Sequence, residues 1–233
     1  MGNVTCIYYT SNREDPQFEK KIQQTLLEAV GDLPIISVSQ KPIDFGTNIV
    51  MPIGRSQLSM FKQILVGLIG IETDIVFFCE HDCLYHPSHF EFTPTKKDKF
   101  FYNKNRWQVD SKTGQALFRH TRCTSLVVAY RDLLIKHFTD LLELIDKSGY
   151  RRSRMGFAPG THRFEGMKCH GVRDFMSEHP CIDVRHASNY TPTRWKKEEH
   201  RNKHSLKGWK ESDSVPFWGK TKGRFDEFLR ELT

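Results

Sequence analysis

The chain has 233 residues, a formal net charge of +7, and 38% hydrophobic and 27% charged residues. This length suits one sizeable α/β domain with its own core, and the composition is that of an ordinary soluble globular protein. The longest uncharged apolar run, residues 64–71, is too short to cross a bilayer, so we expect no membrane span. No signal peptide is visible and the six cysteines lie scattered, which predicts reduced cysteines and a cytoplasmic protein.

Strand and helix patterns alternate over the first eighty residues. We expect strands over residues 4–10, 35–38 and 75–79, with a loop rich in Pro, Gly and Asn at 41–54. A first helix should begin at Asp15-Pro16, an N-cap followed by a first-turn proline, and should end at Gly31. Ser56 can cap a second helix. The order β-α-β-α-β predicts a parallel sheet with right-handed crossovers.

The pattern is less regular after residue 90. Short strands are expected over residues 99–102, 107–109, 116–119 and 125–130, followed by a helix over 131–147. Residues 149–180 should form loops around a helix at 172–177, and residues 181–184 a last strand. After Asn189 we expect irregular structure and then a short terminal helix over 225–232.

Two acidic residues stand at the most informative point of the chain. The apolar run Ile75–Cys79 reads as a strand buried on both faces, and it ends abruptly in Glu80-His81-Asp82. Ligands of parallel α/β sheets bind beyond the carboxyl ends of the strands. Two carboxylates at that point can hold a hard divalent cation against phosphate oxygens. The alternative is an acidic pair that simply faces solvent.

Four segments of the chain resemble those of GT-A glycosyltransferases, the nucleotide-sugar-dependent fold of the family-2-like enzymes. The segments are Thr-Ser-Asn-Arg at 10–13, Gly-Arg-Ser at 54–56, Glu-His-Asp at 80–82 and Asp-Val-Arg-His at 183–186. The third occupies the place of the family's Asp-x-Asp motif, with Glu in place of the first Asp. The second lacks the family's usual Asn. The resemblance as a whole spans roughly residues 4–195.

The resemblance implies a fold, a donor and a cofactor. The fold would be a GT-A type, Rossmann-like α/β sandwich with a mostly parallel central sheet and a basic, irregular C-terminal extension. Residues 1–195 would form the catalytic domain, and residues 196–233 an extension packed on the same domain. The donor would be a UDP-sugar, and Mn²⁺ or Mg²⁺ would neutralise the diphosphate that leaves.

The same resemblance assigns roles to individual residues. The expected metal ligands are Asp82, Glu80 and His186. The expected donor contacts are Thr10, Asn12, Arg13, Arg55, Glu80 and Arg194. Each arginine could equally be a surface residue, and His186 could be structural. An inverting transfer needs a carboxylate to accept the proton of the acceptor hydroxyl, for which Glu165 is the first candidate and Asp174 the second.

The positive charge is concentrated near the C-terminus. Residues 185–224 hold 11 Lys and Arg against 4 Asp and Glu, together with Trp195, Trp209 and Trp218. Basic residues interleaved with aromatic ones suit a polyanion whose bases can stack, although tryptophans that anchor a solvated tail would give the same pattern. The segment is similar to small phage transferases that decorate hydroxymethylated pyrimidines in DNA. That resemblance would make DNA the acceptor and a host cytoplasm the location.

Three alternatives remain open at this point. The acceptor could be a saccharide, a lipid-linked glycan or a protein, or the chain could be a non-catalytic module that binds nucleic acid. A zinc site is the third, because Cys and His residues recur at positions 79, 81, 83, 86 and 89. We do not expect zinc, because this spacing does not match the paired ligands of structural zinc sites.

Overall fold

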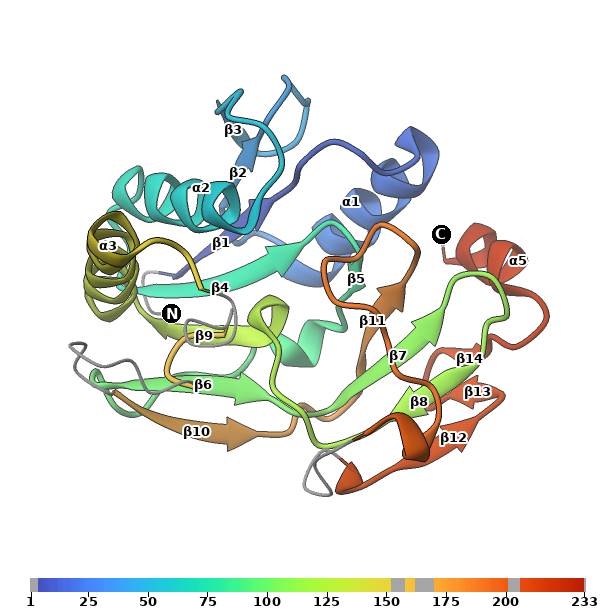
Figure 1. Ribbon diagram of the computed structural model, residues 1–233. Helices are drawn as coiled ribbons and strands as arrows, with labels where there is room; N and C mark the ends of the chain where they lie inside the picture. The colour runs from blue at the N-terminus through green and yellow to red at the C-terminus, as the bar shows by residue number, and fades with distance from the viewer. Residues whose placement is uncertain (1–3, 152–157, 162–169, 201–205, 233) are drawn as a thin grey trace.

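The computed structural model describes residues 4–151, 158–161, 170–200 and 206–232. Its central feature, sheet A, has seven strands in the order β10-β6-β9-β4-β1-β2-β3 (Figure 1). The strands are β1 (Val4–Tyr9), β2 (Ile35–Ser39), β3 (Thr47–Val50), β4 (Ile75–Glu80), β6 (Lys99–Asn103), β9 (Val127–Tyr130) and β10 (Gly171–Phe175). Only β9 runs antiparallel to its neighbours. The predicted α/β class with a mostly parallel sheet is therefore confirmed.

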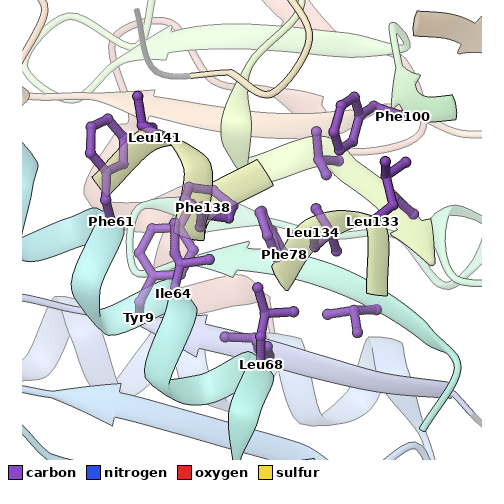
Figure 2. Packing of buried hydrophobic residues seen from close by; sticks show 14 of the residues in the cluster. Tyr9, Phe61, Ile64, Leu68, Phe78, Phe100, Leu133, Leu134, Phe138 and Leu141 are labelled. Carbon is purple, nitrogen blue, oxygen red and sulfur yellow. The ribbon is translucent and has the colours of Figure 1, made fainter. Parts of the chain in front are cut away.

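Helices cover both faces of sheet A. The described residues form four α-helices: α1 (Pro16–Val30), α2 (Gln57–Ile69), α3 (Arg131–Ser148) and α5 (Phe225–Glu231). Helices α2 and α3 pack on one face, where the labelled side chains of Figure 2 interlock, among them Phe61, Phe78 and Phe138. Helix α1 packs on the other face against Tyr8 and Phe77. Because successive residues of β1 and β4 enter opposite cores, these strands are almost wholly apolar, apart from Thr5 and the terminal Glu80.

A second sheet of five strands, sheet B, lies beside sheet A in the order β12-β8-β7-β11-β5 (Figure 1). The strands are β5 (Cys83–Leu84), β7 (Arg106–Asp110), β8 (Ala116–Phe118), β11 (Cys181–Arg185) and β12 (Lys210–Ser212). One face carries Trp107, Val109, Ile182 and Val184 into an apolar core that α1 and α5 also line. The residues that alternate with these along β7 and β11, among them Arg106 and Asp183, point to the opposite face.

The helix starts agree with the expected capping chemistry. Asp15 accepts hydrogen bonds from the backbone N–H groups of Gln17 and Phe18, each at 3.0 Å, ahead of Pro16 in the first turn. Ser56 accepts one from Ser59 at 2.9 Å. Both side chains satisfy N–H groups that have no partner within their helix. Among the described residues, none of the helices has the length and apolar character that crossing a bilayer demands.

Two expectations about loops are wrong. Residues 47–50 form edge strand β3 inside the expected loop, where Asn48 donates to Ser37 Oγ at 2.9 Å and fixes the pairing with β2. Residues 171–175 form strand β10 in place of the expected helix at 172–177, because pairing with β6 satisfies their backbone groups. The stacking of Phe175 on Phe92, with ring centroids 3.8 Å apart, holds that edge. Local propensity had suggested neither contact.

The C-terminal part is more ordered than its composition indicated. Cys181–Arg185 is a strand as expected, but β12, β13 (Ser214–Val215) and β14 (Gly219–Lys220) follow it, so it is not the last one. Strand β12 pairs with β8, and β13 pairs with β14. The short terminal helix is confirmed as α5, with Phe225 and Phe228 buried against sheet B. The pairing of β12 with the distant β8 explains why the segment does not read as structured from its own residues.

Candidate functional site

A large cavity with a volume of about 800 Å³ opens at the carboxyl ends of β1, β4 and β11. Parallel strands place their carboxyl ends at one edge, which is where α/β proteins bind their ligands. Tyr9 and Thr10 reach the cavity from β1, Glu80 and Asp82 from β4, and His186 from β11. Residues that are far apart in sequence therefore meet at this edge.

Asp82 is the most constrained acidic residue of the cavity. Its side chain is buried, and Nδ2 of Asn189 donates a hydrogen bond of 2.7 Å to Oδ2. Nε2 of His186 lies 3.4 Å from the same oxygen. Although burial opposes ionisation, the imidazole of His186 and the charges of His81 and Arg185 lower the pKa of Asp82 to about 2. The carboxylate is therefore ionised at neutral pH.

Glu80 has the opposite electrostatic character. Burial, followed by the nearby charge of Asp82, raises the pKa of Glu80 to about 7. The hydroxyl of Tyr9 donates a hydrogen bond of 2.5 Å to its Oε1. Ligand atoms of Glu80, Asp82 and Cys83 lie within 4.8 Å of one another. Burial raises the pKa of the Cys83 thiol, so the two carboxylates are the ligands available at this point.

Glu14, which the sequence did not single out, completes the cluster. Its Oε2 lies 3.2 Å from Nδ1 of His186, and its Oε1 lies 3.9 Å from Nε2 of His81. Burial alone would lower the pKa of His81, but the carboxylates of Glu14 and Asp82 raise it to about 9. The available signal was its place in the loop after β1, an edge that collects ligand-binding side chains.

This donor set fits a divalent cation. Carboxylate oxygens suit Mg²⁺ and Mn²⁺, and an imidazole beside them favours Mn²⁺. Among the described residues, Nδ1 of His81 and Nδ1 of His186 are buried and make no hydrogen bond. Within the described part of the chain, Nδ1 of His186 has only the carboxylate of Glu14 beside it, at 3.2 Å, so the two imidazoles have ligand capacity to spare. Of the five residues suggested for zinc, His81 and Cys83 fall in two different groups of potential ligands in the described part of the chain, and Cys79 is fully buried within the core.

Four of the other predicted donor contacts line two adjoining cavities. Thr10 lines the large one, while Asn12 and Arg13 line a second cavity of about 320 Å³, and Arg55 lines both. Oδ1 of Asn12 accepts hydrogen bonds from the backbone of Gln40 and Lys41, at 2.8 and 2.9 Å, so its role is to shape this loop.

Arg55 and Arg194 differ in how firmly they are placed. The guanidinium of Arg55 donates to the backbone oxygen of Ser188 and lies 4.1 Å from the ring centroid of Tyr190. This contact ties the start of α2 to the loop after β11. Arg194 is exposed and is not among the residues that line either cavity.

Asp174 is the one candidate base that lies within the described residues. Glu165 lies outside the described residues. Asp174 lies on β10, not on a helix, and accepts hydrogen bonds from Nε of Arg122 at 2.6 Å and from Nη2 at 2.8 Å. Burial opposes its ionisation, but Arg122 and Lys104 outweigh it and lower the pKa of Asp174. A carboxylate held by two cations is a weak proton acceptor.

Six Lys and Arg residues line the large cavity against three Asp and Glu residues. The cations are Arg55, Lys104, Arg106, Arg119, Arg122 and Arg185, and the carboxylates are Glu80, Asp82 and Asp183. Apart from Arg55, these cations come from sheet B or its flanking loops. The acidic motif at 80–82 gave no indication that these residues would line the cavity. The excess of positive charge suits an anionic ligand.

No protein-family model matches this chain, and no curated protein does. Two solved structures are similar in part. A glycosyltransferase involved in glycosylation of the major capsid of PBCV-1 has a TM-score of 0.45 and 10% identity, over 73% of this chain and 81% of that one. The bifunctional IspDF of Campylobacter jejuni has a TM-score of 0.42 and 12% identity, over 76% of this chain. This chain spans only 50% of the IspDF chain, and likeness at these levels does not define an activity.

Proposed function

We propose that the protein is a metal-dependent glycosyltransferase that moves a sugar from a UDP-sugar to a hydroxyl group, with a hydroxymethylated pyrimidine in DNA as acceptor. One observation carries the proposal. Asp82, Glu80 and His186 come from strand ends of two sheets and meet at the rim of a cationic cavity of about 800 Å³. A site that joins metal ligands to an excess of arginine suits a diphosphate bound through a divalent ion.

The ligands would be Asp82, His186 and Glu80, with Mn²⁺ or Mg²⁺ supplying charge neutralisation for the leaving diphosphate. Asn189 fixes the rotamer of Asp82, and Tyr9 fixes that of Glu80, through the hydrogen bonds described above. Such supporting contacts hold ligands in position before the ion arrives. A metal at this point would thus be held by residues that the fold has already oriented.

The donor would lie along sheet A. Thr10, Asn12, Arg13 and Arg55 surround the rim between the two cavities, where a nucleoside and its phosphates can be accommodated. Arg55 stands just before the N-terminus of α2, a position that favours phosphate. We retain Arg194 as a further donor contact, on the loop that follows β11.

For the proton acceptor we retain Glu165, with Asp174 as the alternative. The ion pairs of Asp174 to Arg122 and Lys104 favour Glu165. The catalytic unit in this proposal is residues 1–195, and residues 196–233 pack on it through β12 and α5. We place the protein in the cytoplasm, the host's if the chain is viral.

DNA as acceptor is supported by the charge of the C-terminal segment, while its tryptophans play different parts. Trp218 donates a hydrogen bond of 2.6 Å to the backbone oxygen of Pro180 and packs against sheet B, so it anchors the segment. Trp209 is half-buried and donates to Glu211 at 2.8 Å. A saccharide, lipid-linked glycan or protein acceptor, or a non-catalytic nucleic-acid module, would leave the metal site or the basic segment unused.

The decisive experiment is turnover with Mn²⁺, labelled UDP-sugars and three acceptors: hydroxymethylated DNA, unmodified DNA and an oligosaccharide. Of the three acceptors, we expect only hydroxymethylated DNA to give UDP release and labelled product. Chelation of the metal should abolish this turnover. The affinity for DNA should fall steeply as salt rises. Transfer to the oligosaccharide would replace the acceptor assignment. Release of pyrophosphate instead of UDP, or no turnover of any nucleotide sugar, would overturn the proposal.

A further inference from the structure

The face of sheet B that borders the cavity gathers three guanidinium groups around one carboxylate. Asp183 on β11 accepts hydrogen bonds from Arg106 and from Nη1 of Arg185, the latter at 3.1 Å. The two arginines therefore occupy both oxygens of Asp183. Arg119 follows β8 and lines the same cavity. We call Arg106, Arg119 and Arg185 the arginine cluster.

Arg119 brings a third positive charge to this face. Its Nε donates to Oε1 of Gln108 at 3.1 Å, and its Nη1 lies 3.4 Å from each ring nitrogen of His200. None of the ion pairs formed by the described Asp and Glu residues includes Arg119.

Burial and, next, repulsion from Arg106 lower the pKa of Arg119 to about 10. The attraction of Asp183 acts in the opposite direction but is smaller. The fold thus holds Arg119 beside Arg106 and Arg185, which already share Asp183. The repulsion among these charges destabilises the folded protein, and a bound anion would reduce it.

Arg106 adds an independent sign of a missing partner. Its side chain is 5% exposed, and its Nε is buried without a hydrogen bond in the described part of the chain. A buried guanidinium N–H without an acceptor is costly, so such groups are usually paired by protein, water or ligand. Arg106 lines the cavity, so an anion within it could supply the acceptor.

The register of sheet B explains why these groups share one face. Asp183 pairs with Gln108 across β11 and β7, and Arg185 pairs with Asp110. Residues 106 and 108, like 183 and 185, are two apart on their strands and so point to the same side. Their neighbours Trp107, Val109, Ile182 and Val184 form the buried core on the other side. The polar face is therefore a fixed, preorganised surface rather than a mobile loop.

We propose that the arginine cluster binds a phosphoryl group of the acceptor, independently of the metal. This inference rests on the proposed function, and it assigns the acceptor side of the cavity. The donor contacts Thr10 and Arg55 belong to sheet A and its helix, whereas the cluster belongs to sheet B. Guanidinium groups match the geometry of phosphate oxygens. The Lys and Arg residues that line the cavity outnumber its Asp and Glu residues, so positive charge is left over for a phosphate. For a DNA acceptor, the group is the phosphodiester beside the modified base.

The first test measures inorganic phosphate binding by calorimetry in the presence of EDTA. Wild type should bind phosphate, and Arg119→Gln should weaken binding by about 10- to 100-fold, as expected for one charge-assisted hydrogen bond. Arg119→Lys, which keeps the charge, should lose less. Arg173→Gln is the matched control, because Arg173 is exposed on β10 and lies outside the cavity lining. Melting temperatures without phosphate verify that each variant is folded.

The second test separates the acceptor from the donor. Arg119→Gln should raise KM for the DNA acceptor and leave the affinity for UDP with Mn²⁺ unchanged. With wild type, an oligonucleotide that carries a neutral methylphosphonate beside the modified base should raise KM by the same factor as Arg119→Gln does with unmodified phosphate. Arg119→Gln acting on the methylphosphonate oligonucleotide should show no further increase in KM, because both changes remove the same contact. Equal phosphate binding by wild type and Arg119→Gln, or displacement of phosphate by UDP with Mn²⁺, would overturn the assignment.

The two proposals can fail separately. Asp82→Asn should abolish metal-dependent UDP binding while phosphate binding in EDTA persists. If wild type binds phosphate at the cluster but turns over no nucleotide sugar, the proposed function fails and the anion site stands. If turnover occurs but phosphate does not bind in EDTA, or methylphosphonate has no effect, the acceptor subsite is wrong.

Discussion

Nε2 of His186 lies 3.4 Å from Oδ2 of Asp82, although one residue follows a strand of sheet B and the other a strand of sheet A. The backbone N–H of Val184 donates to the backbone oxygen of Asp82 at 2.8 Å, so the two sheets are joined at this point. The proposed metal site is therefore part of the seam between the sheets. Changes at the site are expected to affect ligand binding more than folding wherever side-chain shape is kept.

Asp82→Asn should remove Mn²⁺-dependent UDP binding. The substitution keeps the shape of the side chain but removes the charge that a hard cation requires, and we expect activity to fall by about 100- to 1,000-fold. The measurement is the shift in melting temperature with Mn²⁺ and UDP, followed by turnover. Asp226→Asn, at an exposed carboxylate of α5, is the control. A variant that binds and turns over like wild type would show that Asp82 is not a ligand.

Glu14→Gln should weaken Mn²⁺ binding although Glu14 is not one of the proposed ligands. Its Oε2 stands 3.2 Å from Nδ1 of His186, on the far side of the ring from Asp82, where a carboxylate orients a ligating imidazole. Loss of such a partner costs about 10- to 100-fold in metal affinity. Titration with Mn²⁺ would measure it, with Glu28→Gln on the exposed side of α1 for comparison. Unchanged affinity would assign Glu14 to structure alone.

The stabilising contribution of Glu80 and His81 in the metal-free protein should fall as pH rises from 4.5 to 9. The pKa of Glu80 is raised from 4.5 to about 7 and that of His81 from 6.5 to about 9, so over those two windows these two groups keep protons in the folded protein that they have lost in the unfolded chain. His89 and His137, whose pKa values burial lowers to about 3 and about 4, contribute with the opposite sign below pH 6.5. The pKa of Asp82 is lowered from 3.8 to about 2. The stabilisation from ionised Asp82 is therefore complete above pH 3.8 and is lost only as the pH falls toward 2.

The variant Glu80→Gln isolates the lower part of this pH dependence. In EDTA its melting temperature relative to that of wild type should rise between pH 4.5 and pH 7, the window set by the shift of Glu80, because wild type alone loses the contribution of the protonated carboxyl. Mn²⁺ should stabilise wild type more above pH 7 than below it, because ionised Glu80 is then available. Parallel melting curves for the two proteins in EDTA would contradict the raised pKa.

Gly114→Ala should loosen the C-terminal segment. Gly114 has a φ of 68°, and a Cβ there would lie 1.9 Å from the backbone oxygen of Thr221, whose hydroxyl donates to Gly114 at 2.7 Å. We expect a loss of about 2–4 kcal/mol in the free energy of unfolding, from overpacking together with the left-handed backbone. Denaturant unfolding provides the measurement.

Gly149→Ala is the matched control for that experiment. Gly149 has a φ of 71°, but no atom lies within 4 Å of the Cβ that would be added. Only the cost of the left-handed conformation applies there, about 1 kcal/mol. Similar losses at the two positions would show that the contact of Gly114 with Thr221 does not hold the segment in place.

Local sequence predicted the elements whose packing is local or complete. The apolar run at 75–79 could only be a strand buried on both faces, and Asp15 and Ser56 fixed the starts of α1 and α2 through their own side chains. The position of Glu80 and Asp82 beyond β4 followed from the same rule. In each case the signal lies within about one helical turn or one strand of the residue concerned.

Edge strands were harder to predict. Strands β3 and β10 exist because each finds one neighbour, β2 or β6, and their own residues contain turn and charged types that do not announce a strand. Asp174 was placed on a helix for this reason and lies on β10 instead. Strand propensity is decided largely by cross-strand partners, which the local pattern does not contain.

By itself, the sequence determined the α/β class, the parallel opening of the sheet and the acidic pair at its edge, because periodicity and capping act through neighbouring residues. Only the tertiary structure decided that Glu14 lies against His186, and that Arg106, Arg119 and Arg185 share one wall of the cavity. Those relationships arise where β11 lies beside β7 and β5 and where two sheets meet. Pairing over such distances depends on the packing of the whole core, and no short stretch of the chain encodes it.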